Sequence, residues 1–115
     1  MNYLGHLILS GTDENILFGN FLGDHVNNKT LNEYPVSVQK GIHLHREIDL
    51  YTDSHPISRE LRALLFDKYR HRSRVILDMF YDHFLAADFS DFHNTLLSDF
   101  VDEVQDILQN RIHLM

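Results

Sequence analysis

The segment from Gly41 to Asp53 places side chains that can bind cations at helical spacing. His45, Asp49 and Asp53 are four residues apart, so in a helix they project from one side. An imidazole and a carboxylate one turn apart can hold one divalent cation, and mixed nitrogen and oxygen donors suit manganese, iron or zinc. Arg46 lies beside them, and its planar guanidinium can bind phosphate. This segment predicts a cation site next to an anion-binding side chain.

A second group, formed by Asp78, Asp82 and His83, lies in an apolar stretch. Asp78 and Asp82 are one turn apart, whereas His83 is about 100° around a helix from Asp82, so the three cannot all point in one direction. Carboxylates among apolar side chains are costly unless a cation compensates their charge. We expect two of the three to share a site.

Two further candidates lie in the first quarter of the chain. His6 is flanked by apolar residues, and Asp24 follows Gly19 and Gly23, which permit close approach of another backbone. Taken singly, a histidine on an apolar face is more often a hydrogen-bonded core residue, and an aspartate at a helix end is more often a cap. Taken with His45, the set favours a shared metal site.

The elements that must position these residues are predicted to be helices. All five glycines lie at or before Gly41, and the two prolines are Pro35 and Pro56, so the rest of the chain contains neither breaker. Apolar residues recur at helical spacing, and no strand pattern of comparable length appears. We expect a single all-α domain, residues 1–115, of about six helices joined by short loops.

Prolines, helix-capping residues and apolar faces indicate where each helix is expected. The first carries Tyr3, Leu4, Leu7 and Ile8; the second spans about 13–26 with Thr12 as N-cap; and the third begins near Pro35 and reaches about residue 52. After Pro56, three apolar faces follow: Leu61, Leu64, Leu65 and Phe66; Val75, Ile76, Met79, Phe80, Phe84 and Leu85; and Leu96, Leu97, Phe100, Val104, Ile107 and Leu108. Ser90 or Asp91 is expected to cap the last helix.

Composition narrows the class of protein. The chain has 17 acidic and 10 basic residues and no cysteine, which excludes disulfide scaffolds, thiolate metal sites and cysteine nucleophiles. Net acidity argues against nucleic-acid binding. No apolar run suits a transmembrane helix or a signal peptide, so we expect a cytoplasmic protein without a membrane partner.

Charge is unevenly distributed along the chain. Six basic residues lie in one short stretch: Arg59, Arg62, Lys68, Arg70, Arg72 and Arg74. The region from 75 to 110 has eight acids and no lysine or arginine. A charge run taken alone is more often a solvated helix face, and the alternative is a docking surface for an acidic partner.

Five short motifs occur in order across most of the chain. They are Asn2-Tyr3-Leu4-Gly5-His6-Leu7; Gly19-Asn20 with Asp24; Gly41-Ile42 with His45-Arg46 and Ile48-Asp49; Thr52-Asp53 with Pro56; and Asp82-His83-Phe84-Leu85. In these motifs and their approximate spacing, the chain resembles the N-terminal part of the acyl carrier protein phosphodiesterase family. Family members are longer, so the chain is expected to lack the C-terminal helices of the family.

The resemblance implies an all-helical fold related to HD-type metal-dependent phosphohydrolases. It also implies hydrolysis of the phosphodiester that joins 4′-phosphopantetheine to a serine of holo-acyl carrier protein, which regenerates the apo form. The cofactor would be a divalent metal, manganese before iron, magnesium or zinc. The chain departs from the family where Gly5 replaces the usual alanine, and at His25, Asn27 and Asn28.

The leading hypothesis assigns roles to the candidate residues. The metal ligands would be His6, Asp24, His45, Asp49 and Asp78. Asp53 or Asp82 would take a proton from water, and Arg46 or His83 would stabilise phosphate charge. The six basic residues would dock the acidic carrier protein.

Two alternatives stay open from the sequence. The same site could hydrolyse a nucleotide or another small phosphoester, or the chain could be a helical binding module without catalysis, in which arginine or histidine pairs with the acids. Helices missing relative to the family would leave an apolar face, and such faces tend to drive association, so a homodimer is expected.

Overall fold

The computed structural model describes residues 3–114, and all regular structure in that range is helical. The six α-helices are α1 (Tyr3–Ile8), α2 (Glu14–Leu22), α3 (Val36–Ser54), α4 (Pro56–Tyr69), α5 (Ser73–Ala87) and α6 (Leu97–Gln109). Short 3-10 turns lie between and after them: η1 (Gly23–His25), η2 (Leu31–Glu33), η3 (Arg70–Arg72), η4 (Phe89–Asp91) and η5 (Ile112–Leu114). The predicted all-α class is confirmed. Asn2, from the first motif, and Met115 lie outside the described residues.

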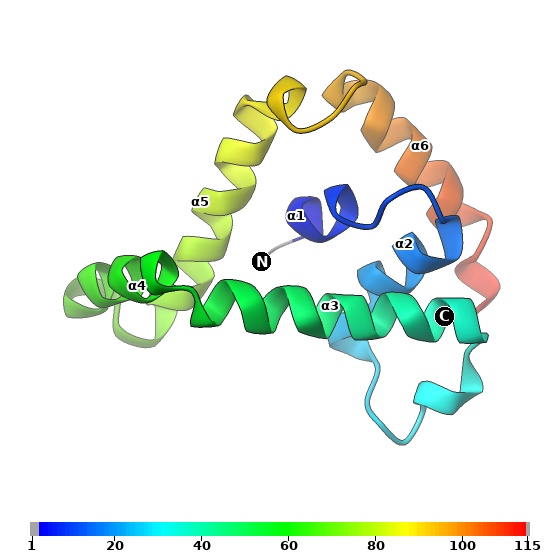
Figure 1. Ribbon diagram of the computed structural model, residues 1–115, viewed down its shortest axis with the longest axis horizontal. Coiled ribbons are helices and arrows are strands. Elements are labelled where there is room, and N and C mark those ends of the chain that lie inside the picture. The colour runs from blue at the N-terminus through cyan, green and yellow to red at the C-terminus, as the bar shows by residue number, and fades with distance from the viewer. Residues whose placement is uncertain (1–2, 115) are drawn as a thin grey trace.

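The helices form a flat arrangement of 43 × 37 × 19 Å. In Figure 1, α3 runs along the base, α2 crosses it, and α5 and α6 arch over α1. This topology brings α1 between α2 and α5, although α5 follows it by more than 60 residues. In residues 3–114 no helix is both long and apolar enough to cross a bilayer.

The closest helix contact joins α2 to α3 at two glycines. A Cβ built on Gly41 would lie 2.1 Å from the Ile16 carbonyl oxygen and 2.8 Å from the Gly19 Cα. A Cβ on Gly19 would meet the Val38 carbonyl oxygen at 2.0 Å. Because no side chain separates the helices here, the two backbones touch. The crossing therefore sets the position of every residue that α2 presents to α3.

Two apolar clusters share α2. One joins α2 to η4 and α6, and its buried members are Leu17, Phe89, Phe100, Val104 and Ile107. The other joins α2 to α3 and consists of Phe18, Leu22, Val26, Val38 and Ile42. Since α2 contributes to both, it is the central element of the core.

The α4–α5 pair contributes little to these clusters. The only buried residues of these two helices are Ser58, Ser73 and Leu77, and the Ser58 and Tyr81 hydroxyls hydrogen-bond at 2.7 Å. Most of the predicted apolar face of α5 is not covered by other helices, because Val75, Met79, Phe80 and Phe84 are 48–61% exposed. Leu77, which faces α4, is the buried apolar residue of α5 instead.

Helix boundaries differ from the predicted ones mainly at the caps. Asp13, not Thr12, caps α2, and its carboxylate accepts hydrogen bonds from the Asn15 and Ile16 amides at 2.9 and 3.2 Å. Ser90 and Asp91 belong to η4, and Leu96 precedes α6. Leu96 is 70% exposed, so its place in the predicted apolar face of α6 is also wrong.

We expect Gly41→Ala to lower the free energy of unfolding by about 3 kcal/mol, because the added methyl group meets backbone atoms that cannot turn aside. In an ordinary helix position the same change is stabilising. Urea unfolding measures the difference. Lys40→Ala, at an exposed neighbouring position of α3, is the control and should change stability by less than about 0.5 kcal/mol. Equal midpoints for Gly41→Ala and the wild type would contradict the glycine contact.

Candidate metal centre

Two histidines from different helices stack beside one carboxylate. His6 on α1 and His45 on α3 are 1% and 3% exposed, and their rings lie 3.7 Å apart at an interplanar angle of 8°. The two oxygens of Asp49, one turn beyond His45, contact the two rings. His6 Nε2 is 3.0 Å from Oδ1, and His45 Nε2 is 3.3 Å from Oδ2. The predicted i, i+4 pairing on α3 is therefore present, with His6 added.

The three residues present their donor atoms to one small volume. One ligand atom from each of His6, His45 and Asp49 can be chosen so that all lie within 4.8 Å of one another. Two ligands that are each about 2.1 Å from a cation and at right angles are about 3 Å apart, which matches the contacts to Asp49. Two imidazoles and one carboxylate suit manganese, iron or zinc. The residues present thus fit a divalent cation.

Asp24 joins this cluster through His45. Its Oδ1 lies 2.9 Å from His45 Nε2, while its side chain is 66% exposed. The ring of His45 sits where a Cβ on Gly23 would be, 2.1 Å from His45 Cγ. A side chain at position 23 would displace the imidazole; the expected close approach of another backbone occurs at Gly19, and the neighbour of Gly23 is the His45 side chain.

A backbone carbonyl orients the ring of His45. Its Nδ1 lies 2.7 Å from the carbonyl oxygen of Asn20. Because a carbonyl can only accept, Nδ1 carries the proton. Nε2, on the other side of the ring, is therefore the nitrogen available to a cation, as in metal sites where the second ring nitrogen is held by a carbonyl.

The cluster shifts the pKa values of two of its members. Burial alone would lower the pKa of His45, but hydrogen bonds with Asp49, Asp24 and the Asn20 carbonyl outweigh it and raise the pKa. For Asp49, burial alone would raise the pKa, but hydrogen bonds from His45 and His6 outweigh it and hold the pKa far below its usual range. Asp49 is therefore a carboxylate throughout the physiological range.

The two aspartates of α5 have different surroundings. Burial, followed by the negative charges of Asp53 and Asp49, raises the pKa of Asp78, against the opposing effect of Arg74. Asp82 accepts hydrogen bonds from the amides of Leu4 and Gly5 at 3.4 and 3.3 Å. Its carboxylate thus holds the N-terminal end of α1, the helix that carries His6.

Asp53 lies one turn beyond Asp49 but binds arginine instead. Its carboxylate pairs with Arg74 and, at 3.8 Å, with Arg62, and its carbonyl accepts a hydrogen bond from Arg62 at 2.6 Å. These contacts join the end of α3 to α4 and α5. They also use two of the six basic residues predicted to dock a partner.

Arg46 and His83 are not among the cluster residues. Arg46 donates hydrogen bonds to the Asn28 side chain at 2.9 Å and the Val26 carbonyl at 3.1 Å, which ties α3 to the loop after η1. His83 is exposed, meets the ring of Phe84 edge-on, and lines a shallow pocket with residues of α5 only.

Asn20 hydrogen-bonds to both histidines, but the sequence placed it only within a motif and predicted no role for it or for Ser10. In the structure Asn20 Nδ2 donates to the His6 carbonyl at 2.8 Å and to Ser10 Oγ at 2.9 Å. The sequence did contain a signal for a buried, hydrogen-bonded side chain: Asn20 is polar but lies between Gly19 and the apolar Phe21 in a helix that must be buried.

The fold and the cluster together define an all-helical protein with a histidine–carboxylate centre suited to a divalent cation. A family model described as acyl carrier protein phosphodiesterase matches residues 1–115. Curated proteins with that name include one from Yersinia pestis, 38% identical over 106 residues, which are 91% of this chain and 55% of the relative. Another, from Escherichia coli O45:K1, is 40% identical over 90 residues, 78% of this chain and 47% of the relative.

This chain therefore belongs to the acyl carrier protein phosphodiesterase family, and the resemblance drawn from its motifs is confirmed. The chain spans about half the length of the curated relatives it matches. No solved structure matches it, so the expected relation to HD-type phosphohydrolases stays a prediction.

The raised pKa of His45 has a consequence for stability. A raised folded-state pKa contributes stability that is fully present below the unfolded value of about 6.5 and is lost as pH rises through the folded value. We expect Asp24→Asn to destabilise the metal-free chain by about 1 kcal/mol at pH 6, since Asp24 is largely exposed, and by less at higher pH. Chemical unfolding at several pH values from 6 to 9 measures this.

The control is Asp102→Asn, which removes an exposed carboxylate from α6. Its effect on stability should stay constant over the same pH range. An Asp24→Asn effect that is equally independent of pH would contradict the charge interaction between Asp24 and His45.

Proposed function

We propose that this chain forms the metal-binding part of a phosphodiesterase that removes 4′-phosphopantetheine from holo-acyl carrier protein and leaves the apo form. The observation that carries the proposal is the convergence of His6 and His45 on the two oxygens of Asp49. Relatives named acyl carrier protein phosphodiesterase support the substrate. The remote spacing of His6 and Asp49, 43 residues apart, makes this an assembled site rather than a local pairing.

We assign the metal to His6, His45 and Asp49, with Asp24 as a fourth ligand and Asp78 close enough to feel the charge of Asp49. Manganese suits this set, and iron, zinc or magnesium are the alternatives. When bound, the cation would polarise the phosphoryl group and favour ionisation of a water molecule.

The other candidate residues differ in how well their contacts suit the predicted roles. The predicted bases, Asp53 and Asp82, already have partners: Asp53 pairs with two arginines, and Asp82 accepts hydrogen bonds from α1 amides. We propose that one of them takes the proton from water once its contacts open, with Asp78 as a further ligand. Arg46 can bind phosphate after release from the loop after η1.

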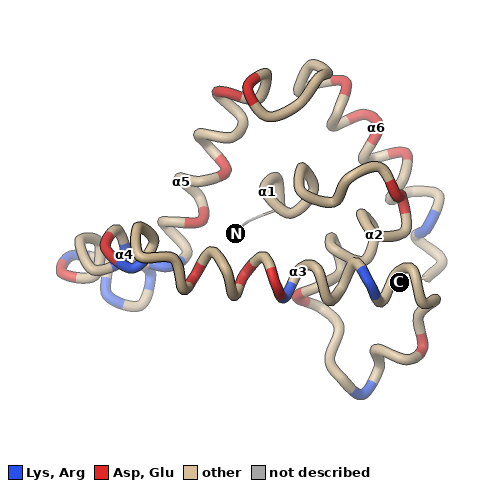
Figure 2. Tube along the Cα trace, viewed as in Figure 1, with Lys and Arg blue, Asp and Glu red and all other residues tan. Residues whose placement is uncertain are grey.

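We propose that the basic end of α4 and η3 docks the acidic carrier protein. Figure 2 shows lysine and arginine gathered at this end, while acidic residues follow α5 and α6. Lys68, Arg70 and Arg72 are exposed, as is Arg59 at the other end of α4. Arg62 and Arg74 hold Asp53, so they are the less suitable docking residues.

The test is a metal titration followed by an activity assay. We expect the chain to bind about one Mn²⁺ in calorimetry, and Asp49→Asn to weaken binding by at least about 100-fold, beyond what loss of an outer contact costs. His43→Ala, at an exposed position on the same helix, should bind as the wild type does. Absence of metal binding in the wild type would contradict the proposal.

Mass spectrometry of holo-acyl carrier protein incubated with the Mn²⁺-loaded chain then reports loss of the phosphopantetheine arm. The double variant Lys68→Glu/Arg72→Glu should raise KM by about tenfold at low salt and less at high salt, since both positions are exposed. Equal cleavage of coenzyme A or nucleotides would favour the small-phosphoester alternative. Metal binding without any cleavage would favour the binding module.

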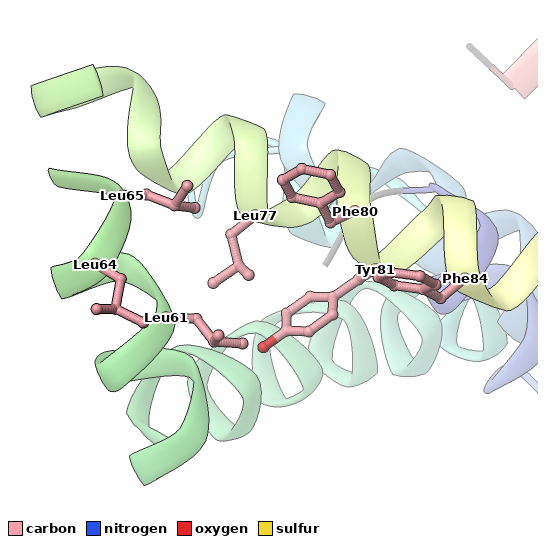
Figure 3. A pocket seen from close by; sticks show the side chains of 7 residues that line it. All are labelled: Leu61, Leu64, Leu65, Leu77, Phe80, Tyr81 and Phe84. Carbon is pink, nitrogen blue, oxygen red and sulfur yellow. The ribbon is translucent and has the colours of Figure 1, made fainter. Parts of the chain in front are cut away.

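An apolar groove on α4 and α5 suggests a second interaction. It has a volume of about 480 Å³ and is lined by Leu61, Leu64, Leu65, Leu77, Phe80, Tyr81 and Phe84 (Figure 3). Exposed apolar surfaces of this kind mark interaction sites. We propose that the groove packs against a second copy of the chain. We also propose a cytoplasmic location, since a protein without cysteine needs no oxidising environment to form disulfides.

Light scattering after gel filtration checks this proposal. We expect twice the 13.6 kDa mass of the chain, and a monomer for Phe84→Glu, which places a charge in the groove. Val36→Glu makes the same kind of change at an exposed apolar residue of α3 and should remain dimeric. A monomeric wild type at high micromolar concentration would contradict self-association.

A further inference from the structure

Asn20 contacts both helices that supply the histidines. It lies on α2 beside Gly19, at the crossing with α3, and is 1% exposed. Its main chain faces His45 on α3, and its side chain faces the peptide of His6 on α1. Among the described residues, Asp49 contacts both histidines with its carboxylate, and Asn20 is the other residue that hydrogen-bonds to both.

The contact with His6 forms a closed set of hydrogen bonds. Asn20 Nδ2 donates to the His6 carbonyl at 2.8 Å and to Ser10 Oγ at 2.9 Å, and Ser10 Oγ donates to the same carbonyl at 2.7 Å. Two N–H donors on one atom are needed here, which an amide provides and a carboxylate does not. The residue type at position 20 is thus set by the His6 peptide.

The helix that carries His6 needs this support. α1 has six residues, and a helix of that length is not stable without tertiary contacts. Asn20 also keeps its buried Oδ1 without a hydrogen-bond partner among the described residues, and leaving such an atom unpaired costs about 1–3 kcal/mol. An apolar residue would fill the space without that cost, so the amide serves more than packing.

We infer that Asn20 is the positioning residue of the metal centre: its side chain fixes the His6 peptide and its carbonyl fixes the His45 ring, so that both Nε2 atoms face Asp49. This inference rests on the proposed metal centre. It assigns Asn20 no contact with the metal or the substrate, and the effect of its side chain on metal binding passes through His6.

The test is a double-mutant cycle on Mn²⁺ affinity, measured by calorimetry on the full chain. Asn20→Asp keeps the shape but removes both donors, and we expect it to weaken Mn²⁺ binding by about 10- to 100-fold. His6→Ala should weaken binding further. In the His6→Ala background, Asn20→Asp should have little additional effect, because the ligand it positions is gone.

Two variants keep the test decisive. Asn32→Asp makes the same chemical change at an exposed position and should leave affinity unchanged. Ser10→Ala removes one hydroxyl from the same hydrogen-bonded set and should weaken Mn²⁺ binding several-fold with helical circular dichroism retained, so it serves if Asn20→Asp does not fold.

The outcomes separate this inference from the proposed function. If the wild type binds Mn²⁺ and both Asn20→Asp and Ser10→Ala bind it equally well, the positioning role is overturned and the metal centre stands. If the loss in Asn20→Asp is as large in the His6→Ala background as in the wild type, the role is structural and the inference also fails. A wild type that binds no Mn²⁺ overturns both.

Discussion

The backbone contact between α2 and α3 is the constraint on which the site depends. With hydrogen atoms alone at Gly19 and Gly41, the two helices approach until main-chain atoms meet. At that separation a carbonyl of α2 comes within 2.7 Å of an imidazole nitrogen on α3. Gly23, one turn further along, leaves the space that the ring of His45 occupies. Small residues thus act here through distance rather than flexibility.

Electrostatics divides the two carboxylates of α3 between separate tasks. Asp49 lies between two buried imidazoles, which keep its pKa low and its charge inside the protein. Asp53, one turn later, is neutralised by Arg62 and Arg74 and joins three helices. The Asp49 carboxylate lies beside imidazole nitrogens that can share a cation with it, whereas Asp53 is already paired with two arginines.

Much of the fold could be predicted because helical periodicity is a local property. The six helices were predicted at approximately their observed positions along the chain, and the His45–Asp49 pair was predicted from its i, i+4 spacing. The exposure of the apolar face of α5 could not be predicted, since periodicity shows which residues share a face but not what covers it. The capping residues were predicted wrongly because neighbouring polar residues, such as Thr12 and Asp13, can each serve as the N-cap of the same helix.

The long-range parts of the site could be predicted only in outline. Asp24 was expected near another helix because of the glycines before it, and the structure places it beside His45. The role of Asn20 depends on partners 14 and 25 residues away; its position between Gly19 and Phe21 indicates a buried polar residue but not which groups it contacts. The placement of Asp82 against α1 depends on an even longer separation, 77 and 78 residues.

That last separation affects the order in which the contacts around α1 can form. A six-residue helix does not persist in isolation, and α1 is held at one end by the Asp82 carboxylate. The support that Asp82 gives to the helix carrying His6 therefore requires α5, whereas the hydrogen bonds from Asn20 and Ser10 to the His6 carbonyl require only α1, α2 and the turn between them. Without α5, the α2–α3 pair, with its nearby partners in sequence, can form alone. The centre thus combines partners 14 to 43 residues apart with a support, Asp82, that lies 77 and 78 residues from the amides it holds.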